Sequence, residues 1–205
     1  MNIIRLRTTS LVAALIAAFA TCALASEPVD CFYGARTAKN DSHGEITRHR
    51  RCAIVQNDGT IRILPRHLRA LDFGSDGLAT LVVAKGRWVY VKQDGATLEV
   101  LPLDNGADYF AEGLVRGRRK GKVAFFDHSF RMVLPPQYDF AWPFEGGLAS
   151  VCSGCREEPA DRPESEYHVL SGGLWGYIDH HGKEVIAVRF SRDDAARRKE
   201  QLPRK

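Results

Sequence analysis

Apolar and polar positions alternate along this chain in short runs that recur in a fixed order. Runs rich in aromatic and β-branched residues are bounded by Gly and Asp, as in Gly86–Val91 and Gly173–Asp179, and such runs predict β-strands. Asp58-Gly59, Asp94-Gly95 and His181-Gly182 each separate two runs, where glycine can take positive φ without a Cβ clash. The pattern predicts an all-β protein built from hairpins.

The strand pattern also repeats. A Phe-led entry and Gly-Leu open each unit, and the Gly stands at positions 77, 113 and 147. These spacings of 36 and 34 residues give a period near 35, which is typical of a repeat array. We expect three to four units of three short strands that stack to bury their apolar faces, as an open array or a propeller-like ring.

Two residue types make this expectation specific. Trp88 and Trp175 hold equivalent positions in their units, so we expect both in the core between units. Pro65, Pro102 and Pro135 have no N–H to donate, and we expect them to mark strand exits.

The last unit resembles the bacterial WG-repeat family, whose unit is roughly F-x-E-G-L-A-x-V, then G-K-W-G-Y-I-D and G-K-x-V-I-P. Phe144–Val151 and Gly173–Ile186 are similar to it, and Val133–Asp139 is similar to its tail. The resemblance covers about residues 52 to 190, although only Trp175-Gly176 keeps the dipeptide. It implies an interaction or binding scaffold with no shared catalytic residues.

The N-terminus predicts export. Arg5 and Arg7 precede an apolar run, and Ala23-Leu24-Ala25 suits a signal peptidase, so residues 1–25 are expected to be a signal peptide. The alternatives are a membrane anchor, for which the run is shorter than the roughly 20 residues needed, and a lipid anchor at Cys22. We expect a periplasmic or secreted protein with no membrane span after cleavage.

Cleavage would leave an N-terminal segment (26–51), the repeat domain (52–190) with an insert (152–171), and a basic tail (191–205). The mature chain would hold 27 basic and 25 acidic residues, since Arg5 and Arg7 leave with the signal peptide. This near-neutral balance argues against nucleic-acid binding. Ser191 is expected to cap a short C-terminal helix that is marginal, or a disordered tail.

Four cysteines remain after cleavage: Cys31, Cys52, Cys152 and Cys155. An even count in an exported chain favours disulfides, and sequence order makes 31–52 and 152–155 the simplest of three pairings. The C-x-x-C spacing keeps a redox pair open as an alternative. A zinc site using His168, His180 and His181 is a further alternative with unsuitable spacing.

The function we expect is non-enzymatic binding, without cofactor or metal, of a protein or an envelope polymer. No G-x-S-x-G, H-E-x-x-H or Gly-rich phosphate loop occurs. One specific version has the protein neutralise a secreted toxin; the alternative is a CxxC-dependent redox or metal-binding envelope protein. Specificity is expected on loops, in the acidic insert and on a basic turn. The candidate residues are Glu157, Glu158, Asp161, Glu164, Glu166, Arg116, Arg118, Arg119 and Lys120.

Overall fold

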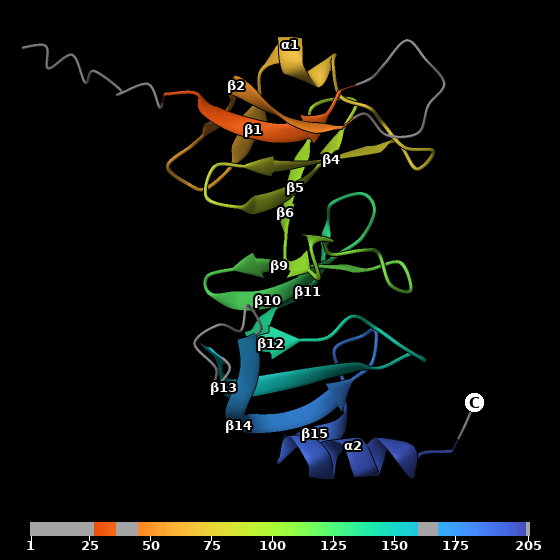
Figure 1. Cartoon of the computed structure of the whole chain (residues 1–205). Helices are drawn as coiled ribbons and strands as arrows, with labels where there is room; N and C mark the ends of the chain where they lie inside the picture. The colour runs from red at the N-terminus through yellow and green to blue at the C-terminus, as the bar shows by residue number, and fades with distance from the viewer. Residues whose placement is uncertain (1–26, 36–44, 160–167, 204–205) are drawn as a thin grey trace, which may run out of the picture.

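The protein is an open, elongated stack of β-layers that ends in a helix (Figure 1). The computed structural model describes residues 27–35, 45–159 and 168–203, so the expected signal peptide lies outside the described residues. Three sheets follow one another along the stack, with six, three and four strands. A small ribbon of β7 (Pro102–Leu103) and β8 (Gly106–Ala107) leads from the first sheet to the second.

The first layer is a six-stranded sheet in the order β3-β2-β1-β4-β5-β6. Its strands are β1 (Val29–Gly34), β2 (Ile46–Val55), β3 (Ile61–Ile63), β4 (Leu78–Val83), β5 (Arg87–Lys92) and β6 (Thr97–Val100). The sheet nearly closes on itself, because Thr97 Oγ1 of β6 donates a hydrogen bond of 2.6 Å to the Ile61 carbonyl of β3. A short helix, α1 (Pro65–Leu68), follows β3.

The N-terminal segment is part of this first sheet rather than an appendage tied to it. Strand β1 lies between β2 and β4, and the Cys31–Cys52 disulfide predicted from sequence joins β1 to β2. Both half-cystines are fully buried in the core of the sheet. The expected boundary at residue 51/52 therefore falls inside β2.

The second and third layers each repeat the predicted three-strand unit. The second contains β9 (Val115–Arg119), β10 (Lys122–Phe126) and β11 (Met132–Tyr138). The third contains β12 (Phe140–Ala141), β13 (Ala149–Pro159), β14 (His168–Ile178) and β15 (Glu184–Phe190). Pro65 and Pro102 follow strand ends as expected, but the prediction for Pro135 is wrong. It lies within β11, which is an edge strand of its sheet and can lack a donor on its outer side.

The Trp strands place their aromatic residues on the face toward the next layer. Trp88 packs against the apolar cluster between the first and second layers, and Val123 at the equivalent position packs between the second and third. Trp175 points beyond the third layer. The expectation of equal burial is wrong for Trp88, which is half-buried, whereas Trp175 is 2 % exposed.

The C-terminal helix α2 (Arg192–Glu200) covers the face of the third layer that has no further layer beneath it (Figure 1). Ser191 is its N-cap, as predicted, with Oγ accepting the N–H of Asp194. The structure has the short C-terminal helix that was one of the two expectations for this tail. Ala195 is buried beside Trp175, and Arg198 lies over Phe190 with its guanidinium 4.1 Å from the ring centroid. Long basic side chains thus supply the contact that an apolar face would otherwise make.

Local steric crowding explains why the residue after Trp175 is a glycine, Gly176. Strand β15 bulges opposite Gly176, since Trp175 pairs with Phe190 while Tyr177 pairs with Ile186. A Cβ on Gly176 would clash with the Ile186 carbonyl oxygen and would lie 2.8 Å from the Ala187 carbonyl. The bulge alone does not require glycine, since β11 bulges in the same way opposite Ala124 of β10. The close approach of the Ile186 and Ala187 carbonyls is what leaves no room for a Cβ at Gly176.

A buried ion pair joins the layers. Asp108, which follows β8, is fully buried, and its carboxylate accepts hydrogen bonds from Nε, Nη2 and the backbone N–H of Arg116 in β9. Arg116 Nη1 donates to the Ala141 carbonyl of β12 at 2.6 Å. One guanidinium therefore links the ribbon after the first layer, the second layer and the third.

We expect Gly176→Ala to destabilise the fold by about 1–3 kcal/mol, because the added methyl must displace the β15 backbone. Urea denaturation followed by tryptophan fluorescence measures this. Gly106→Ala is the matched control, since its Cβ would have only the Leu103 carbonyl oxygen, at 3.9 Å, in contact range. Equal stability of the two variants would contradict the steric explanation.

We expect Arg116→Met to cost about 3–5 kcal/mol of folding free energy, because it leaves the buried Asp108 carboxylate without its partner. The control is Arg131→Met, which removes an ion pair to Asp127 from a side chain that is 79 % exposed and should change stability little. Denaturant midpoints of the two variants make the comparison. A small effect for Arg116→Met would show that the pair does not hold the layers together.

Candidate binding surfaces

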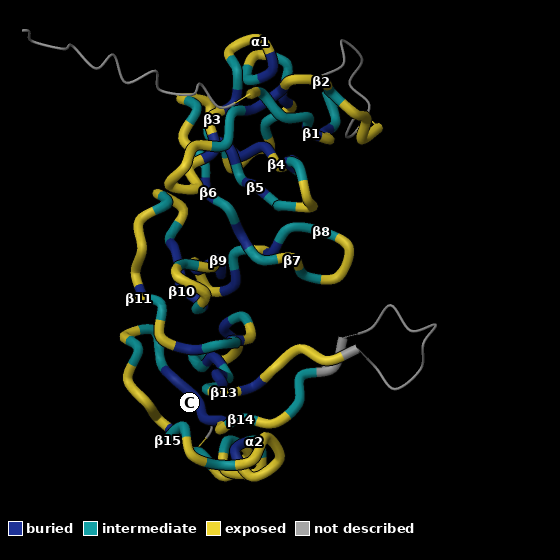
Figure 2. Tube along the Cα trace, turned by 90° about the vertical axis from the view of Figure 1, so that its left-hand side faces the viewer, coloured by how far each residue is buried: buried dark blue, intermediate teal, exposed yellow. Residues whose placement is uncertain are grey.

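The expected insert loop is mostly a β-hairpin that extends out of the third layer. Strands β13 and β14 stay paired from Ala149↔Ile178 outward to Pro159↔His168. We call residues 156–159 and 168–171 the β-arm. Glu157 and Glu158 are exposed on it, and Asp161, Glu164 and Glu166 lie outside the described residues. Figure 2 shows the arm projecting sideways from the stack.

The base of the arm is a tight junction built around the second predicted disulfide. Cys152 and Cys155 pair across a turn of β13 in which Gly154 has φ 78°. Opposite them, Gly173 has φ 72°, and a Cβ there would lie 2.5 Å from Cys152 Sγ. Trp175 Nε1 donates to the Gly172 carbonyl at 3.0 Å, so the buried indole fixes the strand on which the arm begins.

Asp139 connects this junction to the second layer. Its Oδ2 accepts the Gly154 N–H at 2.7 Å, and its Oδ1 lies 2.6 Å from Lys122 Nζ of β10. The hydrogen bond from Gly154 and the Lys122 ammonium hold the pKa of Asp139 below its usual value. The arm therefore leaves the stack in a defined direction.

A groove of about 210 Å³ runs between the arm and the second layer. Its lining includes Glu157 and Leu170 from the arm and Arg118 from β9. The acidic insert and the basic turn were predicted as separate candidate patches, and the structure brings one member of each to the same groove.

The basic turn itself divides into buried and accessible residues. Arg116 was a candidate contact residue, but it is only 2 % exposed and its guanidinium is ion-paired with Asp108, so it cannot contact a partner directly. Arg118 and Lys120 are exposed, and Arg119 is half-buried with its guanidinium 4.7 Å from the centroid of the Phe126 ring. Arg116 and Arg118 lie two residues apart on the same face of β9. They differ because Asp108 and the Ala141 carbonyl enclose Arg116, whereas Arg118 is exposed and donates to the Gly121 and Asp139 carbonyls.

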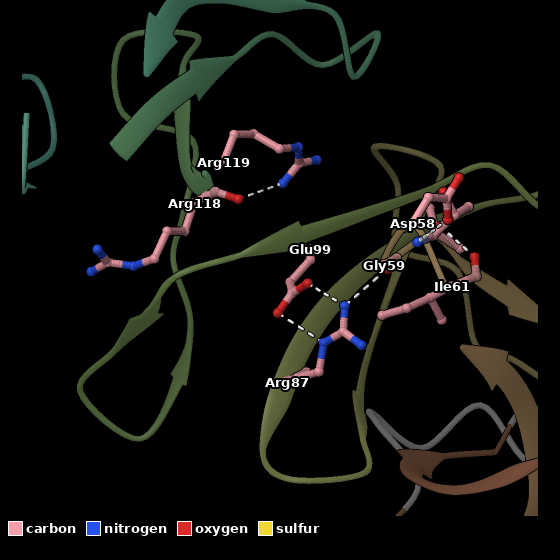
Figure 3. Close-up of polar contacts among 9 residues, drawn as sticks. Asp58, Gly59, Ile61, Arg87, Glu99, Arg118 and Arg119 are labelled. Atoms are coloured by element: carbon pink, nitrogen blue, oxygen red, sulfur yellow. Dashed lines mark hydrogen bonds and ion pairs between the residues drawn. The ribbon is translucent and has the colours of Figure 1, made fainter. Parts of the chain in front are cut away.

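A second cavity lies between this turn and the first layer, and sequence reasoning missed it. It has a volume of about 290 Å³ and is lined on one side by Arg118, Arg119 and Lys120. Asp58, Arg87 and Glu99 of the first layer line the other side. We call it the interlayer cleft. Figure 3 shows Arg119 on one side and the Arg87–Glu99 pair with the Asp58–Ile61 turn on the other.

Among the residues of the zinc and redox alternatives, the two cysteines are enclosed and His180 is engaged elsewhere, while His181 is exposed and the side chain of His168 is outside the described part of the chain. His180 stacks on Phe144 with ring centroids 4.2 Å apart, and its Nε2 lies 3.0 Å from Glu112 Oε2. Cys152 is fully buried, Cys155 is 8 % exposed, and β13 continues past them. Within residues 27–35, 45–159 and 168–203, no group of three or more His, Cys, Asp or Glu side chains could hold a metal ion.

The helices of the described segments are all too short or too polar to cross a membrane.

Comparison with known proteins identifies two of the layers. A family model described as WG containing repeat matches residues 124–154 and 175–192. No curated protein and no solved structure matches the chain. The matched residues begin on the Trp strands β10 and β14, both of which pair with a bulged third strand. The resemblance stated from sequence is confirmed over these two stretches, which match the repeat of the WG family.

Proposed function

We propose that this chain is an exported, non-enzymatic binding protein whose partner contacts the β-arm. The observation that carries the proposal is an arm held in a defined direction on a rigid stack. The Cys152–Cys155 disulfide, Gly173 and the Asp139 contacts fix its base. A site on a rigid support loses little entropy when it binds.

The arm also carries the polar groups that a partner needs. Within the described residues, β12 pairs with β13 only at Val151 and Cys152, and β15 pairs with β14 no farther out than Trp175. Both edges of the arm therefore have unpaired backbone groups, which a partner strand or loop can meet. Glu157 and Glu158 favour a partner with basic groups at the contact.

The ligand class we propose is a protein, with an envelope polymer as the second candidate. A secreted toxin is one specific protein partner that an exported scaffold of this kind would suit. The CxxC alternative has weaker support, because Cys152 is fully buried and Cys155 is 8 % exposed, both within strand β13.

The test shortens the arm. Residues 158–169 are replaced by Asn-Gly, which closes a two-residue hairpin and keeps the Glu157↔Leu170 pair. The partner recovered by the intact protein from envelope extract is identified by mass spectrometry, purified and titrated against both forms. We expect the shortened form to keep its melting temperature and to lose binding of that partner.

A charge variant separates the acidic side chains from the backbone edges. Glu157→Gln combined with Glu158→Gln should weaken binding roughly two- to ten-fold, the effect of removing two exposed ion pairs. The control is Glu145→Gln with Glu200→Gln, which removes two exposed carboxylates away from the arm. Unchanged affinity of the shortened form for the identified partner would overturn the proposal.

A further inference from the structure

The interlayer cleft has an unequal distribution of charge. Four basic residues line it, Arg87, Arg118, Arg119 and Lys120, against two acidic ones, Asp58 and Glu99. The Arg118 guanidinium points away from the Arg87–Glu99 wall and donates to the Gly121 and Asp139 carbonyls, so the charge at the cleft comes from the other three (Figure 3). It lies on the first and second layers, whereas the β-arm belongs to the third. An excess of positive charge between low-dielectric walls attracts anions.

One of the basic residues is already neutralised. Arg87 Nε donates to Glu99 Oε1 at 2.9 Å, and Nη2 bonds both to Glu99 Oε2 and to the Gly59 carbonyl. This pairing raises the pKa of Arg87, with the Glu99 hydrogen bond as the main cause. Arg87 and Glu99 therefore build one wall of the cleft and tie β5 and β6 to the Asp58–Gly59 turn.

The other three basic residues have no such partner. Among the described residues, no carboxylate lies within 4.0 Å of the charged nitrogens of Arg118, Arg119 or Lys120. Arg119 is the most constrained of them. Its stem is half-buried, its guanidinium stacks on Phe126, and Nη1 donates only to the neighbouring Arg118 carbonyl.

Arg119 thus holds a partly desolvated positive charge in a fixed place. Burial lowers the pKa of its guanidinium, and the charge of Glu99 opposes that shift. An arginine stays charged in spite of such a shift. The unmatched charge is a cost in the free protein, and an oxyanion that accepts from the guanidinium would remove it.

Gly117 keeps the two walls close. A Cβ on it would lie 2.8 Å from the Glu99 carbonyl oxygen and 2.9 Å from Phe126 Cε2. Because Gly117 has no side chain, β9 can approach β6 closely enough for the basic turn to stand over the Arg87–Glu99 pair (Figure 3).

We propose that the interlayer cleft binds one oxyanionic group of an acidic polysaccharide, with Arg119 as the central contact and Lys120 at its mouth. The carboxylate of a uronic acid and the sulfate or phosphate of a modified sugar share the chemistry that a guanidinium recognises. The inference goes beyond the proposed function, since it assigns a second site and stands if the arm binds nothing.

The lining favours a polysaccharide over an acidic protein. Protein interfaces are organised around buried apolar and aromatic anchors, whereas Ile61 is the one apolar side chain among the described residues that line this cleft. Its volume is near the lower end of ordinary ligand pockets, roughly 300–1,000 Å³. One charged unit of a chain fits such a space, and neighbouring units can then extend along Lys120.

The experiment titrates the full mature chain by calorimetry with polygalacturonate, dextran sulfate, neutral dextran and inorganic phosphate, at two salt concentrations. We expect an acidic polymer to bind, neutral dextran not to bind, and the affinity to fall as salt rises. Arg119→Gln should weaken binding about ten-fold or more, the value of a charged hydrogen bond. Lys120→Gln, at an exposed position, should also weaken it.

The matched controls remove charge from similar places outside the cleft. Arg189 lies over Phe190 at 5.3 Å, much as Arg119 lies over Phe126, and it is exposed on β15. Lys183 is exposed on the turn before that strand. Arg189→Gln and Lys183→Gln should leave the affinity unchanged, and melting temperatures check that each variant is folded.

Three outcomes would overturn the proposal. One is equal loss of affinity in the Arg189→Gln and Arg119→Gln variants, which would mean attraction to the surface as a whole. Another is binding of free phosphate with no binding of either acidic polymer. The third is that the arm-shortened form loses polymer binding while the cleft variants keep it, which would place the polymer on the arm. Retained binding by the arm-shortened form would support the cleft.

Discussion

Contact between successive layers is the constraint on which this structure depends. The three-stranded unit of the second layer is too small to have a core of its own, and its strand β10 buries both faces. Ala124 and Phe126 pack toward the first layer, and Val123 and Phe125 pack toward the third. A sheet buried on both faces gains its stability from its neighbours. The Asp108–Arg116 pair adds a directional link at the same junctions, since a buried guanidinium with fixed acceptors allows few alternative arrangements.

Much of this architecture could be predicted from the sequence because repetition reveals it. The period near 35, the Gly positions of the turns and the Cys31–Cys52 pairing all follow from spacing. Four turns share one geometry, in which Gln56, Lys92, Asp127 and Asp179 each donate an N–H to the carbonyl four residues later. The third residue after Gln56, Lys92 and Asp179 is Gly with positive φ, and the third residue after Asp127 is Phe130, which adopts φ 65°. A glycine search alone therefore misses that turn.

The candidate site was harder to predict, because it depends on which residues neighbouring layers bring together. A run of basic residues does not show that Arg116 is enclosed while Arg118 is exposed, because the two share one face of β9 and differ only in what neighbouring elements place beside them. The carboxylate that encloses Arg116 comes from the ribbon before it, eight residues away. The interlayer cleft joins residues about 60 positions apart, such as Asp58 and Arg119, and no local pattern connects them. The insert was misjudged as a loop because its two strands are separated by residues rich in Pro and acids.

The helix α2 has a consequence for how such a chain can change in length. It packs on β14 and β15, on the face toward which a further layer would stack. Because α2 covers the exposed face of whichever layer comes last, the fold of a single unit does not fix the number of layers. A whole unit duplicated between β15 and Ser191 would present the same face to the same helix. Gain or loss of units by recombination at this point would leave the last layer covered by α2. Each added layer would also create a new junction between layers, with its own charged residues at the side of the stack.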